Sequence, residues 1–242
     1  MERLQFKVER FLSFFENKVE SIEKTQFYGE QDTYLFKKIL YAGMLDTLAK
    51  TVSSKRFNQS QRFQRLVESF ADWENCKKIS VTHLIRLLEK VPDQEFNDLR
   101  RHVHLKKKEW PIMVKVPLDK DLEYNEVFKL WPRNIEKPFE NISIVNLSHS
   151  YLLYKHRCTM VHELREPGYG FEFEDDQEPF YHSRDGGDSK PYGWELVYPV
   201  NFYRQVVLNV IKNLGGYFMD NGIDPYNSYT YGTFWLEELN WG

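Results

Sequence analysis

The chain has few cysteines and no long apolar run. Among its 242 residues only Cys76 and Cys158 carry a thiol, and they form no CxxC pair and no metal-ligand spacing. The first residues, MERLQFKVERF, mix both charge signs and do not resemble a secretion signal. No window reaches the roughly 18 consecutive apolar residues of a membrane span. These absences predict a cytoplasmic protein with reduced thiols and no membrane partner.

Motifs that would hold phosphate or metal are missing as well. The sequence contains no GxxxxGK[ST] loop, no GxGxxG loop, no HExxH pair and no nucleophile elbow. Of seven histidines only His102 and His104 stand at a ligand-like spacing, and the lysines beside them would repel a cation. We therefore expect no metal and no cofactor. Cys158 lies one helical turn before His162, but a cysteine in mid-helix is more typical of a small core residue than of a catalytic thiolate.

The overall charge argues against a non-specific polyanion binder. The net charge is −3 and the pI is near 6.2, whereas such binders have a domain pI above about 9. The exception is the basic run RRHVHLKKK at residues 100–108. Two interpretations of it remain open. Arg100, Arg101, Lys106 and Lys107 contact RNA phosphates, or the cations offset the dipole at a helix C-terminus and stay solvated.

Apolar residues are abundant and follow a helical period. Hydrophobic residues make up 41% of the chain and aromatic residues 16%, which is ample for a packed core. Apolar side chains at three- and four-residue steps predict an all-α fold, with helices at about 6–22, 32–53, 60–72, 80–91, 93–108, 144–164 and from 199 onward. Ser80 is the expected N-cap of the fourth helix. Gly215 and Gly216 predict a weak point late in the last helix.

Three segments interrupt this helical pattern within one expected domain, residues 1–242. Residues 106–140 contain four prolines and read as an irregular insertion with one short edge strand. Residues 168–198 combine alternating aromatics with a Gly-Gly pair, which indicates a β-hairpin or a long acidic loop. The aromatic tail, residues 222–242, is expected to pack on the bundle or to fill a dimer interface.

The candidate site lies in LYKHRCTMVHELREPGYG, residues 153–170, where Arg157 and His162 precede a Pro-Gly stop. On an ideal helix the two residues are separated by ~140° and ~7.5 Å along the axis, so they do not share a face. The core stripe of this helix is expected at Leu147, Tyr151, Tyr154, Cys158 and Val161. That places His162 on its flank and leaves His156 exposed. Three arrangements remain open: the long side chain of Arg157 reaches around the helix, the helix is distorted, or a second subunit supplies the partner charge.

The residues YKHRCTMVHE resemble the signature of the HEPN superfamily, α-helical bundles that share an R-x4–6-H motif on a late helix. The order of elements is similar, with long helices first and one helix after the motif. YAGMLDTLAK resembles the early helix that often places an acid near the site, here Asp46. Two positions depart from the pattern. Cys158 stands where many members have Asn, Asp or His, and Leu164 stands where toxin members often have Tyr.

The resemblance implies a metal-independent endoribonuclease that acts as a homodimer, so that two motifs face one cleft. His162 would exchange protons with the 2′-oxygen and the leaving 5′-oxygen of RNA, and Arg157 would stabilise charge on the phosphate. Glu163 would orient either residue, and Tyr154 would stack on an unpaired base. A role as a toxin or in phage defence is implied, with an antitoxin or regulatory protein as partner.

Three alternatives remain beside this expectation. Arg157 pairs with an acid such as Asp46 or Glu163 while His162 forms a hydrogen bond inside the bundle, and the motif is structural. The chain is a HEPN-like module without catalysis that binds a nucleotide or a partner protein. The chain is a purely structural interaction module whose aromatic tail supplies the interface.

Overall fold

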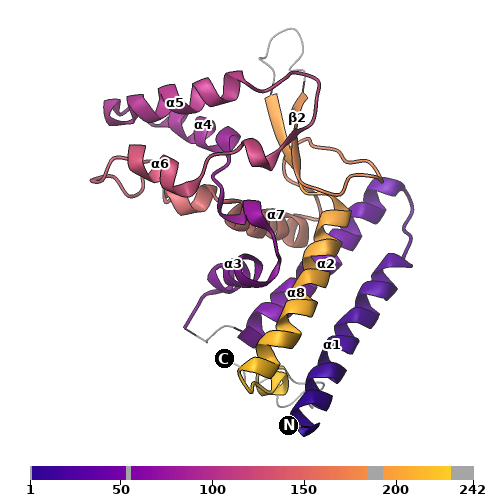
Figure 1. The fold of residues 1–242 in the computed structure, drawn as a ribbon. Coiled ribbons are helices and arrows are strands. Elements are labelled where there is room, and N and C mark those ends of the chain that lie inside the picture. Colours follow the sequence, from indigo (N-terminus) through magenta and orange to yellow (C-terminus); the bar gives the residue numbers. More distant parts are fainter. Residues whose placement is uncertain (1, 53–55, 185–192, 230–242) are drawn as a thin grey trace.

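The computed structural model describes residues 2–52, 56–184 and 193–229, which form a mainly helical protein with a small antiparallel sheet (Figure 1). The mainly α-helical class predicted from the sequence is confirmed. The α-helices are α1 (Glu2–Glu23), α2 (Glu30–Val52), α3 (Gln59–Phe70), α4 (Val81–Lys90), α5 (Asn97–Lys108), α6 (Tyr124–Leu130), α7 (His149–Glu163) and α8 (Val200–Asp220). The strands are β1 (Val116–Pro117), β2 (Phe180–Arg184) and β3 (Gly193–Val197).

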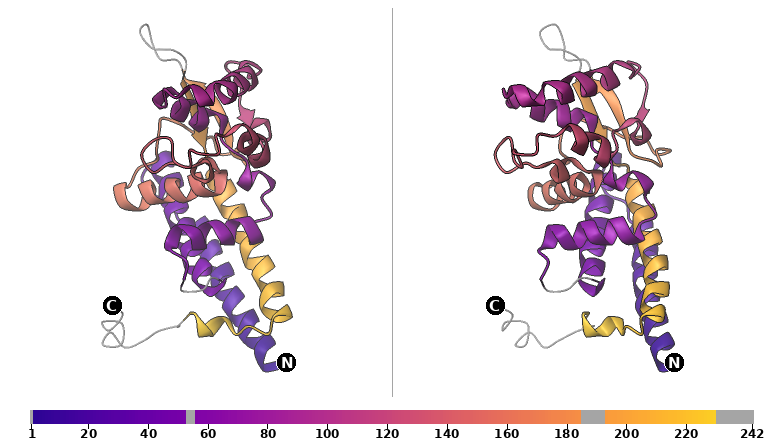
Figure 2. Two further views of the ribbon diagram at one scale, coloured as in Figure 1. Left: turned by 90° about the vertical axis from the view of Figure 1, so that its left-hand side faces the viewer. Right: turned by 60° about the vertical axis from the view of Figure 1, so that its left-hand side comes forward.

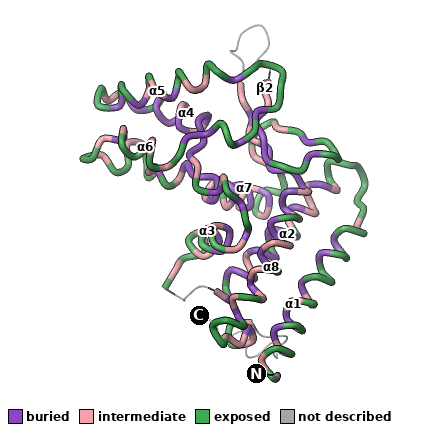
Figure 3. The backbone as a smooth tube through the Cα atoms, in the orientation of Figure 1, coloured by how far each residue is buried: buried purple, intermediate pink, exposed green. Residues whose placement is uncertain are grey.

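The long helices form a bundle, and the sheet lies at one end of it. α1 runs along α8, α2 packs on both α8 and α3, and α7 crosses α2 and α3 (Figures 1 and 2). α4 and α5 pack on each other beside the sheet, at the end away from the N-terminus. The buried positions lie along the inward faces of these helices and continue into the sheet (Figure 3). One apolar core therefore connects the bundle to the sheet.

Polar caps fix where several helices begin. Ser80 caps α4 as predicted, because its hydroxyl accepts from the backbone N–H of His83. Asn58 and Gln61 form a capping box at the start of α3. Ser148 caps α7. At the other end, α7 stops at Leu164, whose φ of 51° is left-handed, three residues before Pro167.

Two sequence-based expectations about helices are wrong. The helix expected at about 144–164 is a 3-10 turn, Ile144–Leu147, followed by α7, because the Ser148 cap separates them. The segment expected to be irregular contains α6, which spans only seven residues and is too short to show a period. α8 continues through Gly215 and Gly216 without a break. A Cβ atom at Gly215 would lie 2.9 Å from Leu12 Cδ1, so this glycine permits close packing of α8 on α1.

The strand expectations are confirmed. β2 and β3 pair antiparallel as a hairpin, and β1 adds to β2 as a short edge strand in the order β1-β2-β3. Of the aromatic tail, residues up to 229 are described, and they pack back on α1, where Tyr226 and Tyr229 contact the ring of Phe11. Residues 230–242 lie outside the described part. Within the described part, no helix is both long and apolar enough to cross a bilayer.

Candidate functional site

The buried face of α7 is polar, and the predicted core stripe of this helix is wrong. Its buried side chains are His149, Ser150, Leu153, His156, Arg157 and Met160. Tyr151, Tyr154, Cys158 and Val161, which were expected inside, are only partly buried. His156, expected to be exposed, is buried, and its Nδ1 lies 3.0 Å from the Tyr203 hydroxyl. Because each polar side chain on this face has at least one hydrogen-bond partner, its burial costs little, and the apolar pattern misidentifies the inner face.

Arg157 faces α2, where its guanidinium donates to the carboxylate of Asp46. Both side chains are close to nine-tenths buried. Burial raises the pKa of Asp46 against the opposing pull of the guanidinium. Burial alone would lower the pKa of Arg157, but the carboxylate outweighs it and raises that pKa, so the arginine stays charged. Among the described residues, Arg157 Nε has no hydrogen-bond partner.

A hollow of about 290 Å³ opens beside this pair, between α2 and α3. It is lined by Asp46, Ala49, Lys50, Gln59 and Arg62. Lys50 is exposed, and Arg62 Nε donates to the backbone carbonyl of Phe57 at the start of α3. Two cations therefore border the hollow and a third, Arg157, stands behind its single carboxylate. Such a site attracts an anion.

His162 does not join Arg157 within one chain. It lies exposed in the last turn of α7, and it makes no hydrogen bond or ion pair with any residue that the structure describes. Because α7 is a regular helix, the ~140° separation places His162 on the solvent side while Arg157 points inward. His162 therefore does not form a hydrogen bond inside the bundle.

The other residues proposed for the site are divided between the core and the surface. Tyr154 packs on Phe63 of α3, with ring centroids 5.6 Å apart, and lies near Arg157. Cys158 Sγ is 3.9 Å from Arg157 Nη1. Glu163 is exposed and pairs with Arg165. The structure thus brings Asp46, Tyr154 and Cys158 to Arg157, and it leaves Glu163 at the surface.

Two of the four basic residues proposed to contact RNA are used inside the protein. Arg100 donates to backbone carbonyls at the end of α4, including that of Asp93 at 2.8 Å. Lys107 Nζ lies 3.7 Å and 3.5 Å from the ring centroids of Trp110 and Trp194. Burial lowers the pKa of Lys107 to about 6, while the faces of the two rings favour its cationic form. Neither side chain is free to bind a phosphate.

Arg101 and Lys106 remain at the surface of α5. Arg101 pairs with Asp98 at 3.4 Å, and Lys106 pairs with Glu109 at 3.7 Å. Exposed pairs of this kind are worth only about 0–1 kcal/mol, so either cation can exchange its partner for a phosphate. Together with the exposed Lys108, the basic run therefore offers three surface cations, fewer than the five in its sequence.

The sequence did not single out Lys50, Gln59 and Arg62. Each is a common residue of a solvated helix face, and only the packing of α3 on α2 brings them around Asp46. No group of three or more histidine, cysteine or acidic side chains in the described residues is arranged to hold a metal ion.

Comparisons with known proteins returned no relatives. No family model, no curated protein and no solved structure matches this chain.

A partly buried histidine on α4, His83, predicts a loss of stability in mild acid. Burial, with the nearby charges of Arg86 and His149, lowers the pKa of His83 to about 3. Histidine in an unfolded chain titrates near pH 6.5, so below this pH the unfolded state binds a proton that the folded state does not bind. The free energy of unfolding therefore falls as the pH drops from 6.5 toward 3. Between pH 6.5 and 5 we expect His83 to account for about 2 kcal/mol of this loss, at ~1.4 kcal/mol per pH unit.

Urea unfolding of wild type and His83→Asn over this pH range measures the effect. Asparagine keeps a polar atom near Ser80 Oγ, which lies 2.8 Å from His83 Nδ1, and does not titrate. The wild type should lose more stability per pH unit than the variant. Parallel curves for the two proteins would show that His83 is not the titrating group.

Proposed function

We propose that the protein is a metal-independent endoribonuclease of the HEPN type that acts as a homodimer in the cytoplasm. The observation that carries the proposal is the hollow beside Asp46, which is bordered by Lys50 and Arg62 and lies next to Arg157. A phosphate of a single-stranded RNA would enter this hollow, and the fork of Arg157 would stabilise charge on its oxygens.

A second copy of the chain is part of the proposal because one copy separates Arg157 from His162. His162 is exposed and unengaged among the described residues, which leaves it available to a phosphate bound at the other copy. In a two-fold arrangement each motif faces its equivalent, so two histidines serve one phosphate. A dimer is therefore required for cleavage in this proposal.

The chemistry balances without a metal. One histidine takes the proton of the 2′-hydroxyl, and the 2′-oxygen forms a bond to phosphorus. The bond from phosphorus to the 5′-oxygen breaks, and the second histidine donates a proton to that oxygen. The products are a 2′,3′-cyclic phosphate and a 5′-hydroxyl end. The proposed biological role is that of a toxin or a phage-defence factor, held in check by an antitoxin or regulatory protein.

The second candidate is a HEPN-like module that binds a nucleotide or a partner protein without cleaving RNA. One observation favours it, since the guanidinium of Arg157 is already bonded to Asp46 and is mostly buried. The departures at Cys158 and Leu164 point the same way. The two candidates differ in whether RNA is cut.

We expect cleavage of labelled single-stranded RNA in EDTA, with cyclic phosphate ends that disappear in two variants. His162→Ala removes the proton carrier, and a loss of about 100-fold is expected. Arg157→Lys keeps the positive charge beside Asp46 but removes the planar fork, so a similar loss is expected while the fold is retained. Arg157→Ala is less informative, because it leaves Asp46 buried without a partner and destabilises the protein.

His104→Ala is the matched control, since His104 is an exposed histidine on α5. Its cleavage rate should stay within about twofold of wild type, a difference too small for a catalytic residue. Bound but intact RNA supports the second candidate. Cleavage that survives both variants, or a wild type that cuts as a monomer by light scattering, overturns the first.

A further inference from the structure

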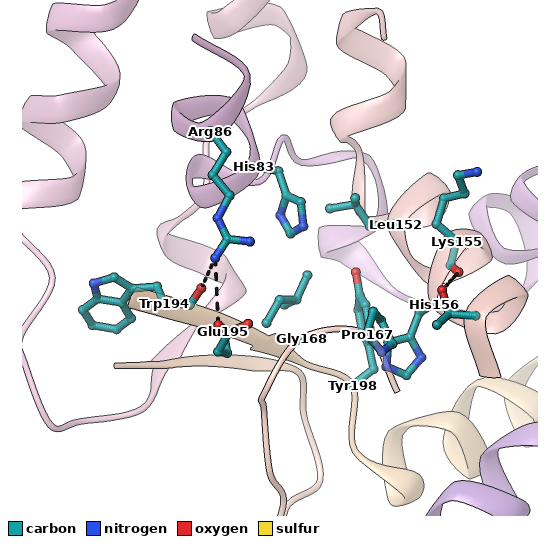
Figure 4. Close-up of a pocket in the computed structure, with 12 residues that line it drawn as sticks. His83, Arg86, Leu152, Lys155, His156, Pro167, Gly168, Trp194, Glu195 and Tyr198 are labelled. Atoms are coloured by element: carbon teal, nitrogen blue, oxygen red, sulfur yellow. Dashed lines mark hydrogen bonds and ion pairs between the residues drawn. The ribbon is translucent and has the colours of Figure 1, made fainter. Parts of the chain in front are cut away.

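A groove lies on the side of α7 away from Arg157. It consists of two adjoining hollows of about 170 and 530 Å³ that share His83, Arg86, Leu152 and Lys155. Arg86 and His83 project from α4 toward β3, whose Trp194 and Glu195 lie opposite, and the segment at Pro167 and Gly168 adds to the lining (Figure 4). Since Lys155 and Arg157 are two residues apart on a helix, ~200° separates them, and the groove is distinct from the hollow at Asp46.

Cations outnumber acids in this groove. Arg86, Lys90 and Lys155 contribute three positive charges to its lining, and Glu195 and Glu140 contribute two negative ones. Arg86 is held by the backbone carbonyl of Trp194 at 3.2 Å and by Glu195 at 4.0 Å, which orients its guanidinium. Lys90 and Lys155 are exposed, and neither forms an ion pair with a described residue. Two ammonium groups are thus available to an anion.

The imidazole of His83 is fixed between these cations by buried groups. Its Nδ1 lies 2.8 Å from Ser80 Oγ, and Ser80 Oγ lies 2.7 Å from the Tyr181 hydroxyl, which donates to Asp121. Because Nδ1 is engaged in this chain of hydrogen bonds, Nε2 is the ring nitrogen left for a ligand. A fixed imidazole nitrogen selects a hydrogen-bonding ligand group by its position.

The larger hollow is mainly apolar. Its walls include Leu87, Phe139, Ile142, Leu147, Tyr151 and Leu152. An inorganic anion uses none of this surface, whereas a flat heteroaromatic ring would cover it and would pack on the aromatic side chains. The groove therefore combines a cationic end with an apolar slot, and its volumes suit a small organic ligand.

We infer that this groove binds a nucleotide, with the phosphate held by the cations of its lining and the base in the apolar slot. The site goes beyond the cleavage proposed above, because none of its residues belongs to the Arg157 hollow. The same chemistry is offered by a free nucleotide and by one nucleotide of an RNA strand. The test separates these sources.

Calorimetric titrations with adenosine 5′-monophosphate, inorganic phosphate and an octauridylate RNA test the inference. We expect wild type to bind a nucleotide probe at least tenfold more tightly than inorganic phosphate. Lys155→Gln should weaken that binding about tenfold, and Lys90→Gln should weaken it by a smaller factor. Lys212→Gln, at an exposed position on α8, is the matched control and should change it less than twofold.

Every outcome of these titrations supports or overturns the inference that the groove binds a nucleotide. Binding of the monophosphate identifies a free nucleotide as ligand, and binding of the octauridylate alone identifies a strand. Lys155 lines this groove and not the hollow at Asp46, so binding that falls in Lys155→Gln reports on the groove, and failure of the cleavage proposal does not affect the result. The inference is overturned if no probe binds, if binding ignores Lys155→Gln, or if phosphate binds as tightly as the nucleotide.

Discussion

Replacing Lys38 by methionine is expected to lower the free energy of unfolding by about 3–5 kcal/mol. Lys38 is fully buried on α2, and its ammonium pairs with Glu166 at 2.8 Å and with Glu172, itself buried. The methionine has a similar length but no charge, so the variant leaves two carboxylates close together without their cation. Keeping a carboxylate buried in the folded state without its cation is costly, because the remaining charge has lost its compensation.

The pKa values of the two partners shift in opposite directions, since burial raises that of Glu172 in spite of Lys38, whereas that of Glu166 falls. Burial alone would raise the pKa of Glu166, but the hydrogen bond with His156 and the charge of Lys38 lower it to about 2. A depressed carboxylate stabilises the fold above pH ~4.3 and loses this effect as the pH falls toward 2. Without Lys38 this stabilisation shrinks, so the difference between wild type and variant should be largest near neutral pH.

Thermal unfolding followed by circular dichroism measures the effect, which corresponds to a fall in midpoint of roughly 10 °C. Lys24→Met is the control, because Lys24 is an exposed residue directly after α1. Adding Glu172→Gln to Lys38→Met removes one of the two charges and should restore part of the stability. An unchanged midpoint in the single variant would show that the cluster does not hold the fold.

Replacing Asp121 by alanine should cost a similar 3–5 kcal/mol, because three buried donors lose their acceptor. The carboxylate of Asp121 accepts from the backbone N–H of Val81 at 2.8 Å, from the Tyr181 hydroxyl at 2.8 Å and from His149 Nε2 at 2.7 Å. These partners belong to α4, β2 and α7. One carboxylate therefore joins the sheet to two helices.

Two further variants distinguish this connection from a general effect of losing an acid. Asp119→Ala removes an exposed carboxylate two residues away and should change stability by less than about 1 kcal/mol. Asp121→Asn keeps one acceptor oxygen and should lose less than the alanine variant. Chemical denaturation of the three proteins checks the order. Equal stability of Asp119→Ala and Asp121→Ala would contradict the assignment.

Most of the helical bundle could be predicted from the sequence because its long helices carry regular apolar stripes. α1 to α5 and α8 follow the three- and four-residue period, and the cap at Ser80 marks the start of α4. α6 was not predicted because its seven residues span fewer than two helical periods. The helical structure of long amphipathic segments can therefore be predicted from the sequence, whereas that of short segments is determined by their tertiary contacts.

The buried face of α7 was not predictable from the sequence, and the reason is different. Its inner side carries His149, His156 and Arg157, and each is satisfied by a residue distant in sequence. A pattern that counts apolar residues cannot recognise such a face, because the partners become known only when the fold is assembled. The nearness of Asp46 to Arg157 was expected from the family resemblance alone. The cations of the groove gave no signal, since single lysines on helices resemble a solvated surface.

The loop after α7 tolerates only the smallest residue at one point. Gly168 has a φ of +78°, and a Cβ atom there would lie 2.6 Å from Glu195 Oε2. Any larger residue would push aside the carboxylate that orients Arg86. The absence of a side chain at Gly168 thus lets Glu195 orient the guanidinium of Arg86 on α4. The shape of the groove therefore depends on a residue that carries no functional group of its own.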